Sequence, residues 1–343
     1  MSEAVEAVAP RLFSPTLLGF GGAAIGNLYR PVSDEAAVAA VAQSWSQGVR
    51  YFDTAPHYGF GLGEQRLGAA LEQIDPHGEA LVSTKVGRLL TPVETGARER
   101  HGFVDANAFE PVFDYSHDGV MRSFEDSLDR LGRDHVDILF AHDLGAATHG
   151  AAHAGRWSEF IGGGYRALRR LRDEGAVGAI GLGVNEWQVC EQAMTEGEFD
   201  VFLLAGRYTL LEQTALASFL PRCAEQGVSV IVGGPFNSGV LACATLSEAH
   251  YDYGVPPEWV STKVAALRAV CADWDVELPA AALQFPLAHP QVISVIPGLA
   301  NAGEVHAAAK RMAAPIPPGF WTDLVDRGLI DPAAPVPGTE RAP

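Results

Sequence analysis

Eight short apolar runs, nearly all of them continuous, alternate along the chain with longer segments in which apolar residues recur every three or four positions. Runs of this kind are typical of strands buried on both faces, as in a parallel sheet covered by helices. The expected strands lie within residues 16–22, 48–55, 80–87, 135–143, 175–185, 200–208, 227–235 and 291–298.

The segments between the runs are expected to form helices, because their apolar residues follow helical spacing. In the first of them Ser33 is a suitable helix cap, and Asp34 and Glu35 fall in the first turn, where acidic side chains are favourable. Further helices are expected around residues 67–74, 120–131, 162–174, 187–196, 216–223 and 304–312.

The alternation of strand and helix indicates an α/β fold. A doubly wound sheet could be built from the same units, but eight regular units favour a single (β/α)8 TIM barrel with its active site at the carboxyl ends of the strands. Since no linker rich in Pro, Gly or Ser interrupts the chain, we expect one domain over 15–330 and a mobile tail over 331–343. Residues 88–117 are too long for a plain connection, and we expect them to form an irregular functional loop.

The glycine-rich stretch GFGGAA, at residues 19–24, fits the fingerprint of a dinucleotide-binding Rossmann sheet. That fingerprint requires a helix to begin inside the motif. Here the stretch IGNLYRPVS intervenes, and Pro31 delays the helix. We therefore interpret Gly21 and Gly22 as positions where a ligand approaches the backbone at the mouth of a barrel.

Composition narrows the possible partners. The 343 residues carry 24 Lys and Arg against 42 Asp and Glu, a net charge of −18 that would repel nucleic acid and anionic membranes. The sequence shows neither a signal peptide nor an apolar run near the ~20 residues that span a membrane. We expect a cytoplasmic protein with no bound metal, whose thiols are reduced because their spacing suits neither metal binding nor a disulfide scaffold: Cys190, Cys223, Cys243 and Cys271.

Four polar residues are expected to meet at the carboxyl ends of consecutive strands. They are Asp53 after the second strand, with Tyr58 five residues further in the same loop, Lys85 after the third strand and His142 after the fourth. A free phenol, with a pKa of ~10, is a poor base near neutral pH. A nearby ammonium favours the phenolate, a carboxylate holds that ammonium, and a histidine can orient the substrate oxygen and share its proton.

Each of these residues also has an ordinary structural interpretation. An aspartate at a strand end is often a helix cap, a lysine can be the partner in a buried ion pair, and a lone histidine is more often a hydrogen-bonded residue of the rim. Their placement together on consecutive strand ends favours catalysis over these separate explanations.

The motif DTAPHYGFGLGEQRLGAAL, at residues 53–71, resembles the signature of the aldo-keto reductases, (β/α)8 oxidoreductases that use a nicotinamide cofactor without a Rossmann domain. The likeness extends from about residue 16 to residue 312. It implies that Asp53, Tyr58, Lys85 and His142 form the catalytic tetrad. It also implies that the cofactor is held by Gly21, Gly22, Asn185, Gly234, Phe236, Ser238, Gly298 and Glu304.

The chain departs from the family's pattern in the expected cofactor site. Many members stack an aromatic ring on the nicotinamide, and this chain has Gly233 there. Members that prefer NADP carry basic residues near the start of the last barrel helix, where this chain has Gly298 and Glu304. A carboxylate would repel the 2′-phosphate but can accept a hydrogen bond from a free ribose hydroxyl. We therefore expect NAD rather than NADP, and we expect Lys310 and Arg311 to lie beyond easy reach of the helix start.

Smaller motifs, HDLG, GGYRAL, GVNEW and GRYTLL, resemble the aldose 1-dehydrogenase branch of the family. The resemblance implies an NAD-dependent dehydrogenase that oxidises the anomeric hydroxyl of L-fucose, L-galactose or D-arabinose to a lactone, or a pyridoxal 4-dehydrogenase. An NADPH-dependent carbonyl reductase on the same tetrad is the alternative activity. A non-catalytic subunit that senses the cofactor is disfavoured by the intact tetrad.

Overall fold

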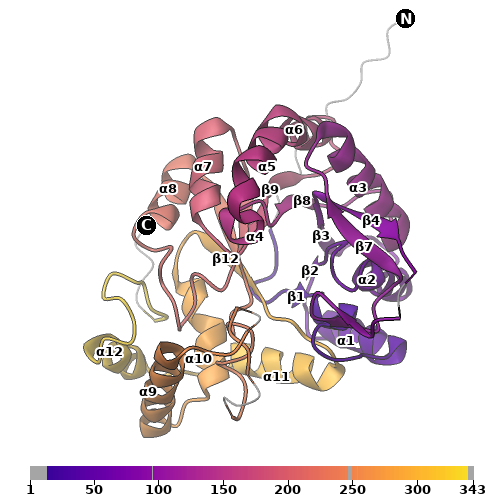
Figure 1. Cartoon of the computed structure of the whole chain (residues 1–343). Helices are drawn as coiled ribbons and strands as arrows, with labels where there is room; N and C mark the ends of the chain where they lie inside the picture. Colours follow the sequence, from indigo (N-terminus) through magenta and orange to yellow (C-terminus); the bar gives the residue numbers. More distant parts are fainter. Residues whose placement is uncertain (1–13, 95, 246–248, 253, 339–343) are drawn as a thin grey trace, which may run out of the picture.

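The eight apolar runs form the eight parallel strands of a barrel in the computed structural model, which describes residues 14–338 except 95, 246–248 and 253 (Figure 1). The sheet runs in the order β1-β2-β3-β8-β9-β10-β11-β12. The strands are β1 (Phe20–Gly21), β2 (Tyr51–Asp53), β3 (Leu81–Val86), β8 (Ile138–His142), β9 (Ala179–Val184), β10 (Val201–Ala205), β11 (Ser229–Gly233) and β12 (Val292–Ile296).

Parallel bridges between Leu18 and Val295 and between Gly21 and Gly298 join the last strand to the first. The (β/α)8 TIM barrel is therefore confirmed. The residues within the strands alternate between two sides: Ile138 and Phe140 point into the barrel interior, while Leu139 and Ala141 pack toward the helices. Burial on both sides explains why the strands read as continuous apolar runs.

The helices surround the barrel, as Figure 1 shows. Ser33 caps α1 as expected, because its Oγ accepts a hydrogen bond from the Ala36 amide at 3.2 Å. The helices that follow the strands around the barrel are α1 (Asp34–Ser46), α2 (Leu62–Ile74), α3 (His117–Leu131), α6 (Tyr165–Asp173), α7 (Gln188–Glu196), α8 (Phe219–Gln226), α10 (Leu278–Gln284) and α11 (Ala302–Met312). Helices α9 (Glu258–Trp274) and α12 (Pro318–Asp326) pack against each other outside this ring (Figure 1).

The connection between β8 and α6 is more helical than the sequence suggested. It holds α4 (Ala146–His149), a 3-10 turn at Gly150–Ala152, α5 (His153–Glu159) and a π-helical turn at Phe160–Gly164. The helix expected around 162–174 therefore continues from α5. Its glycines permit close packing, since a Cβ on Gly164 would lie 2.4 Å from the Tyr115 carbonyl oxygen.

Residues 88–117 are not the irregular loop that we expected. Strand β4 (Arg88–Pro92) pairs antiparallel with β7 (Phe109–Phe113), and β5 (Glu99–Arg100) pairs with β6 (Phe103–Val104). Figure 1 shows β4 and β7 side by side at the edge of the barrel, and Arg88, His101 and Phe103 of this segment line a recess at its mouth.

The C-terminal end also differs from expectation for the part that the structure describes. Ala334 is buried and Val336 packs against the hydrophobic core, so residues 331–338 lie on the barrel instead of forming a free tail. Residues 339–343 of the expected tail lie outside the described part.

His289, which precedes β12, links folding to pH. Burial lowers its pKa from the usual 6.5 to about 4. Between these values the unfolded chain binds more protons than the folded chain, so the stabilising contribution is complete above pH 6.5 and is lost as the pH falls toward 4. On lowering the pH from 7 to 4.5, we expect this residue alone to decrease the free energy of unfolding by roughly 1–3 kcal/mol.

The variant His289→Asn retains an acceptor for the Gln291 amide, which donates to His289 Nδ1 at 3.2 Å. Urea unfolding of the wild type and this variant at pH 7 and pH 4.5 measures the effect. The variant should lose less stability on acidification than the wild type, whereas a variant of the exposed His77 should behave as the wild type does. An equal loss in the wild type and His289→Asn would contradict the prediction.

Candidate active site

The four residues expected to form the catalytic tetrad come together at the carboxyl ends of β2, β3 and β8. Lys85 Nζ donates to both carboxylate oxygens of Asp53, at 2.9 and 2.7 Å, and to the carbonyl oxygen of Thr54 at 2.8 Å. The same nitrogen lies 3.1 Å from Tyr58 Oη. The imidazole of His142 meets the Tyr58 ring edge to face, with 6.0 Å between the ring centroids.

The Asp53–Lys85 pair is almost completely buried. Burial raises the pKa of the Asp53 carboxyl, and the Lys85 ammonium and a 2.7 Å hydrogen bond from Ser83 Oγ counteract that rise. Ser83 is in turn 2.9 Å from Tyr51 Oη inside the barrel. The hydrogen bond from Ser83 thus fixes the Asp53 carboxylate, and the carboxylate holds the Lys85 ammonium against Tyr58.

His142 is held as a neutral side chain. Burial lowers its pKa well below 6.5, and the positive charges of Arg88 and Lys85 lower it further. Its Nε2 lies 3.5 Å from Asp143 Oδ2. A neutral imidazole beside the Tyr58 phenol can donate a hydrogen bond to a substrate oxygen without carrying a charge of its own.

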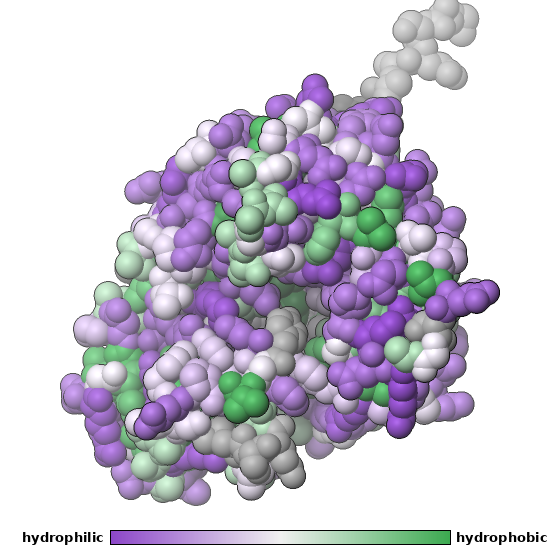
Figure 2. Space-filling model, viewed as in Figure 1, coloured by the Kyte–Doolittle hydropathy of each residue, from purple (hydrophilic) through white to green (hydrophobic). Residues whose placement is uncertain are grey.

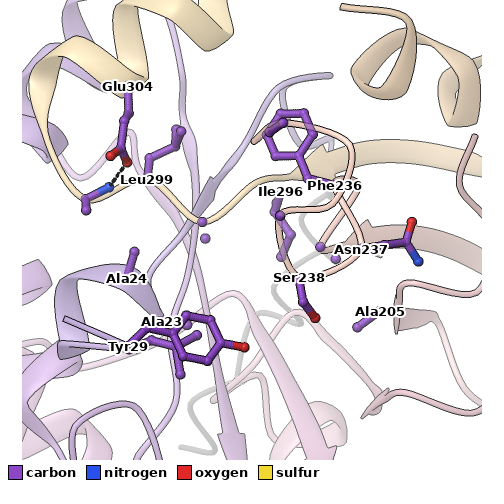
Figure 3. A pocket seen from close by; sticks show the side chains of 18 of the residues that line it. Ala23, Ala24, Tyr29, Ala205, Phe236, Asn237, Ser238, Ile296, Leu299 and Glu304 are labelled. Atoms are coloured by element: carbon purple, nitrogen blue, oxygen red, sulfur yellow. Dashed lines mark hydrogen bonds between the residues drawn. The ribbon is translucent and has the colours of Figure 1, made fainter. Parts of the chain in front are cut away.

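A cleft with a cavity volume of ≈ 890 Å³ is lined by Asp53 and Tyr58 and also by residues at the start of α11. Figure 3 shows part of its wall, with Phe236, Leu299 and Glu304 around the opening. The cleft is lined by every expected cofactor-binding residue: Gly21, Gly22, Asn185, Gly234, Phe236, Ser238, Gly298 and Glu304. Its volume falls within the usual range for small-molecule and cofactor sites. One end contains Asp53 and Tyr58 and the other contains Arg311, a shape that suits an extended dinucleotide.

The sequence suggested that a ligand approaches the backbone at Gly21 and Gly22, but the structure gives a different reason for glycine at these two positions. A Cβ on Gly22 would lie 2.6 Å from the Asp53 carbonyl oxygen, and one on Gly21 would lie 2.8 Å from that of Pro297. The backbone that approaches them is therefore that of the neighbouring strand ends. Both glycines still line the cleft, and the Gly22 amide donates to Asp53 O at 2.8 Å, which positions the first member of the tetrad.

Gly233 ends β11, where many relatives were expected to carry an aromatic ring. A Cβ at this position would lie 2.9 Å from Leu203 Cδ2, so the side chain of Leu203 occupies the adjacent space. Leu203 and Ala205 line both the cleft and the recess in front of Tyr58. The wall at this point is aliphatic.

Glu304 has structural partners that the sequence did not reveal. Its carboxylate accepts from the Ala300 amide at 2.8 Å and from Asn301 Nδ2 at 2.9 Å, while its own amide donates to Asn301 Oδ1 at 3.0 Å. This reciprocal arrangement caps α11. Arg30, which is 274 positions away in the sequence, forms an ion pair with the same carboxylate.

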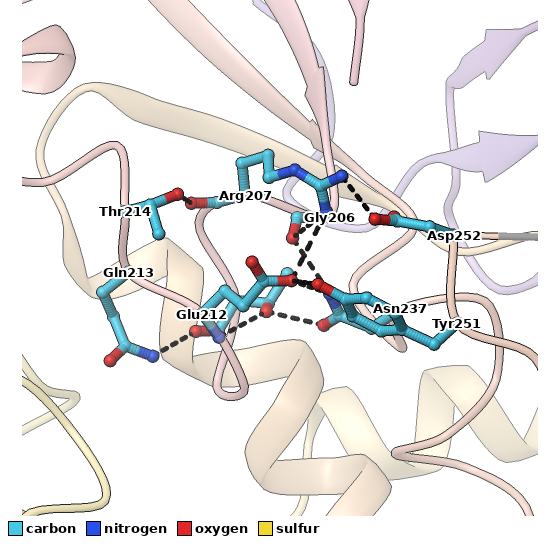
Figure 4. Close-up of polar contacts among 9 residues, drawn as sticks. Gly206, Arg207, Glu212, Gln213, Thr214, Asn237, Tyr251 and Asp252 are labelled. Carbon is cyan, nitrogen blue, oxygen red and sulfur yellow. Dashed lines mark hydrogen bonds and ion pairs between the residues drawn. The ribbon is translucent and has the colours of Figure 1, made fainter. Parts of the chain in front are cut away.

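A polar network supports the loop after β11 (Figure 4). Asn237 accepts from Thr209 Oγ1 at 2.6 Å and donates to the Gly206 carbonyl oxygen at 2.9 Å. Arg207 pairs with Asp252 at 2.7 Å. The loop that carries Phe236 and Ser238 is thereby fastened to the segment after β10.

A second, smaller recess of ≈ 450 Å³ opens in front of Tyr58, Lys85 and His142. Figure 2 shows the corresponding hollow near the middle of this face, with a mainly hydrophilic rim. Its walls combine apolar side chains with many charged and polar ones: His57, Arg88, His101, Asp143, Thr148, Glu186, Arg207 and Asp252. Such a lining suits a small substrate with several hydroxyl groups.

The sequence interpretation had not identified several of these residues. Arg88 follows Lys85 by three positions, and Asp143 follows His142 by one. Because functional residues of such barrels lie at the carboxyl ends of the strands, both could have been included. Arg207 lies two positions after the end of β10, so the same reasoning could have included it. Arg30 and Asp252 carry no comparable signal, because their places depend on loops that meet across the barrel mouth.

The model of the aldo/keto reductase family matches residues 17–326. A pyridoxal 4-dehydrogenase of Microbacterium luteolum is 42% identical, over 92% of this chain and 94% of that protein. A D-threo-aldose 1-dehydrogenase of a Pseudomonas species is 38% identical, over 96% of this chain and 99% of that one. An L-galactose dehydrogenase of Arabidopsis thaliana is 30% identical, over 84% and 81%.

Solved structures of more distant proteins share the fold. A glycerol dehydrogenase of Gluconobacter oxydans aligns with a TM-score of 0.72 at 19% identity, covering 98% of both chains. An aldo-keto reductase of Bacillus halodurans in its holo form aligns with a TM-score of 0.70 at 24% identity, covering 96% of both. Among the described residues, none of the helices combines the length and apolarity needed to cross a membrane.

Proposed function

The chain belongs to the aldo/keto reductase family, and we propose that it is an NAD-dependent dehydrogenase that oxidises the anomeric hydroxyl of an aldose to the lactone. The observation that carries this proposal is the position of Lys85 Nζ, 3.1 Å from Tyr58 Oη and paired with the buried Asp53, beside a recess with charged walls. This arrangement supplies a proton acceptor where a sugar hydroxyl can reach it.

In the proposed reaction, Tyr58 takes the proton of the anomeric hydroxyl, and Lys85 stabilises the phenolate that accepts it. Asp53 keeps the ammonium in place. The neutral His142 donates a hydrogen bond to the reacting oxygen and fixes its direction. The nicotinamide cofactor, when bound, accepts the hydride. In the opposite direction the same phenol returns the proton, so the tetrad also suits carbonyl reduction.

The aldose assignment is supported by the polar lining of the recess and by the names of the relatives, two of which are aldose or galactose dehydrogenases. A pyridoxal 4-dehydrogenase is the second candidate, because the protein of that name is 42% identical over most of the chain. Both substrates present a hydroxyl on a cyclic hemiacetal, so the same proton transfer serves either.

Turnover measured with L-fucose, L-galactose, D-arabinose and pyridoxal, each with NAD and with NADP, tests the proposal. We expect an aldose with NAD to give the highest kcat/KM and a lactone as the product. Turnover of pyridoxal alone would move the function to the second candidate. Reduction of simple aldehydes by NADPH, without oxidation of any hemiacetal, would overturn the proposal.

The preference for NAD rests on the charges at the far end of the cleft. Arg311 does line the cleft, contrary to our expectation from its position along α11, and Arg30 lines it too. Both guanidinium groups are already paired with carboxylates, Arg311 with Glu277 and Arg30 with Glu304. A 2′-phosphate would have to compete with these carboxylates, whereas a free ribose hydroxyl could donate to Glu304.

Substitution of Glu304 tests cofactor selectivity. In Glu304→Gln, an amide keeps an acceptor for the Ala300 amide but removes the negative charge and releases Arg30, so the preference for NAD should narrow by about 10-fold. In Glu304→Arg, a bidentate phosphate partner is added, and the preference should narrow further or reverse. Values of kcat/KM for both cofactors measure the effect.

Thermal unfolding separates this effect from damage to the cap of α11. Both variants should still show a positive shift in Tm with saturating NAD, even if the shift is smaller and their Tm without cofactor is lower. A wild type that prefers NADP, or a preference unchanged in both variants, would show that Glu304 does not select the cofactor.

We further infer a cytoplasmic location. The inference is supported by the cysteines, all four of which are free, with Cys190, Cys223 and Cys271 buried. Unpaired thiols are usual in the reducing cytoplasm.

A further inference from the structure

An ion pair outside the tetrad, Arg88–Asp143, lies directly beside the reacting groups. Arg88 and Asp143 both line the recess in front of Tyr58, and their side chains are only 11% and 19% exposed. The Asp143 carboxylate accepts from Arg88 Nη2, and its Oδ2 lies 3.5 Å from Nε2 of His142. The pair therefore reaches the space next to the oxygen that His142 would hold.

The backbone fixes the Asp143 carboxylate in this place. Asp143 adopts a left-handed conformation with φ 50°, immediately after the last residue of β8, and its amide donates to the Gly183 carbonyl oxygen at 2.9 Å. This conformation is uncommon for residues other than glycine, although aspartate and asparagine tolerate it better than most. Strained residues of this kind concentrate at functional sites.

Arg88 is held with similar firmness. Its guanidinium carbon lies 4.4 Å from the centre of the Phe113 ring, and its Nη1 is 3.4 Å from Nδ1 of His57. Its buried Nε has no hydrogen-bond partner among the residues that the structure describes. Removing two charges from water is costly, and a buried ion pair adds little net stability. The pair is better explained by recognition of a polar group than by stability.

We propose that Asp143, held by Arg88, binds the hydroxyl on the carbon adjacent to the reacting carbon, and so makes a free 2-hydroxyl group a requirement of the substrate. The inference rests on the proposed oxidation of an aldose. The oxygens on neighbouring ring carbons of a sugar lie at hydrogen-bonding separation, so an anomeric oxygen at His142 places the 2-hydroxyl beside Asp143. A carboxylate accepts the proton of that hydroxyl, and Arg88 can donate to its oxygen.

The recess carries a second ion pair that serves as a control. Arg207 and Asp252 form an ion pair at 2.7 Å and also line the recess, but they extend from the segment after β10 and from the loop before α9. Asp252 is 47% exposed. Its removal can weaken the binding of a sugar without touching the position beside His142.

The test compares sugars that differ in the 2-hydroxyl alone: D-arabinose with 2-deoxy-D-ribose, and L-fucose with 2-deoxy-L-fucose. In the wild type we expect kcat/KM to be about 10- to 100-fold higher for the 2-hydroxy sugar, the scale of one hydrogen bond to a charged group. In Asp143→Ala the two sugars of a pair should differ in kcat/KM by no more than about 3-fold. In Asp143→Asn, which keeps an acceptor and suits the left-handed backbone, the ratio should be intermediate. In Asp252→Asn it should stay at the wild-type value.

The ratio distinguishes recognition of the substrate from support of His142. If Asp143→Ala lowered kcat/KM equally for both sugars of a pair and left the ratio unchanged, Asp143 would merely position His142 and the inference would be overturned. A wild type that oxidises both sugars equally would overturn it as well. If the wild type oxidised no hemiacetal at all, the proposed function itself would fail. The shift in Tm produced by NAD should be the same in both Asp143 variants as in the wild type, which controls for an intact cofactor site.

Discussion

Replacing Tyr58 by phenylalanine should lower kcat by about 100-fold or more, the usual contribution of a single general acid or base. In the proposed mechanism the Tyr58 oxygen, which lies 3.1 Å from Lys85 Nζ, accepts the proton, so the substitution removes the acceptor and keeps the ring. The buried Asp53–Lys85 pair retains its own hydrogen bonds. We therefore expect the Kd for NAD, measured by quenching of protein fluorescence, to change little.

Tyr165→Phe provides the matched control. Tyr165 lies on α6, and its hydroxyl bonds the backbone of residue 198, far from the tetrad. This variant should keep kcat within a few-fold of the wild type. If Tyr58→Phe kept it equally well, the proton would be transferred by another group and the assignment of Tyr58 would be wrong.

The variant Lys85→Met should reduce turnover and also shift the pH profile of kcat to higher pH. Without the ammonium, nothing at this position favours the phenolate, so the phenol gives up its proton only at a more alkaline pH. The same substitution leaves the carboxylate of Asp53 buried without its counter-charge, which should destabilise the fold by about 3–5 kcal/mol. Activity across pH 6–10 and urea unfolding at pH 7 measure the two effects.

The double variant Asp53→Asn/Lys85→Met separates catalysis from stability. It removes both charges, so most of the lost stability should return while turnover stays low. Recovery of turnover together with stability would mean that Lys85 acts by supporting the fold. An unchanged pH profile in Lys85→Met, with weaker substrate binding alone, would mean that Lys85 merely lines the recess.

The barrel was predictable because its pattern is local. Strands such as β8 and β10 are buried on both faces, so each can be recognised as an apolar run within a short window of sequence. Eight repeats of strand and helix then leave few ways to close the chain, since parallel connections are right-handed. The β4–β7 hairpin lacked such a signal, because its strands are half-exposed and contain Pro92 and Pro111.

The tetrad was predictable for a related reason. Parallel strands present their carboxyl ends at the same face of a barrel, so Asp53, Lys85 and His142 had to converge once the strands were identified. The sequence could not show how closely they approach. The lowered pKa of His142 also follows from packing. Burial is its main cause, and the positive charges of Arg88 and Lys85, brought close by the fold, lower the pKa further.

The sequence by itself therefore determined the (β/α)8 barrel, the family and the convergence of Asp53, Tyr58, Lys85 and His142, because each depends on short-range patterns or on strand order. Tertiary structure alone decided which charges face one another across the mouth. Arg30 meets Glu304, Arg88 meets Asp143 and Arg207 meets Asp252 through pairings 274, 55 and 45 positions apart. Such long-range pairs leave no periodicity in the sequence, because side chains from different loops form ion pairs only where the folded backbone brings them together.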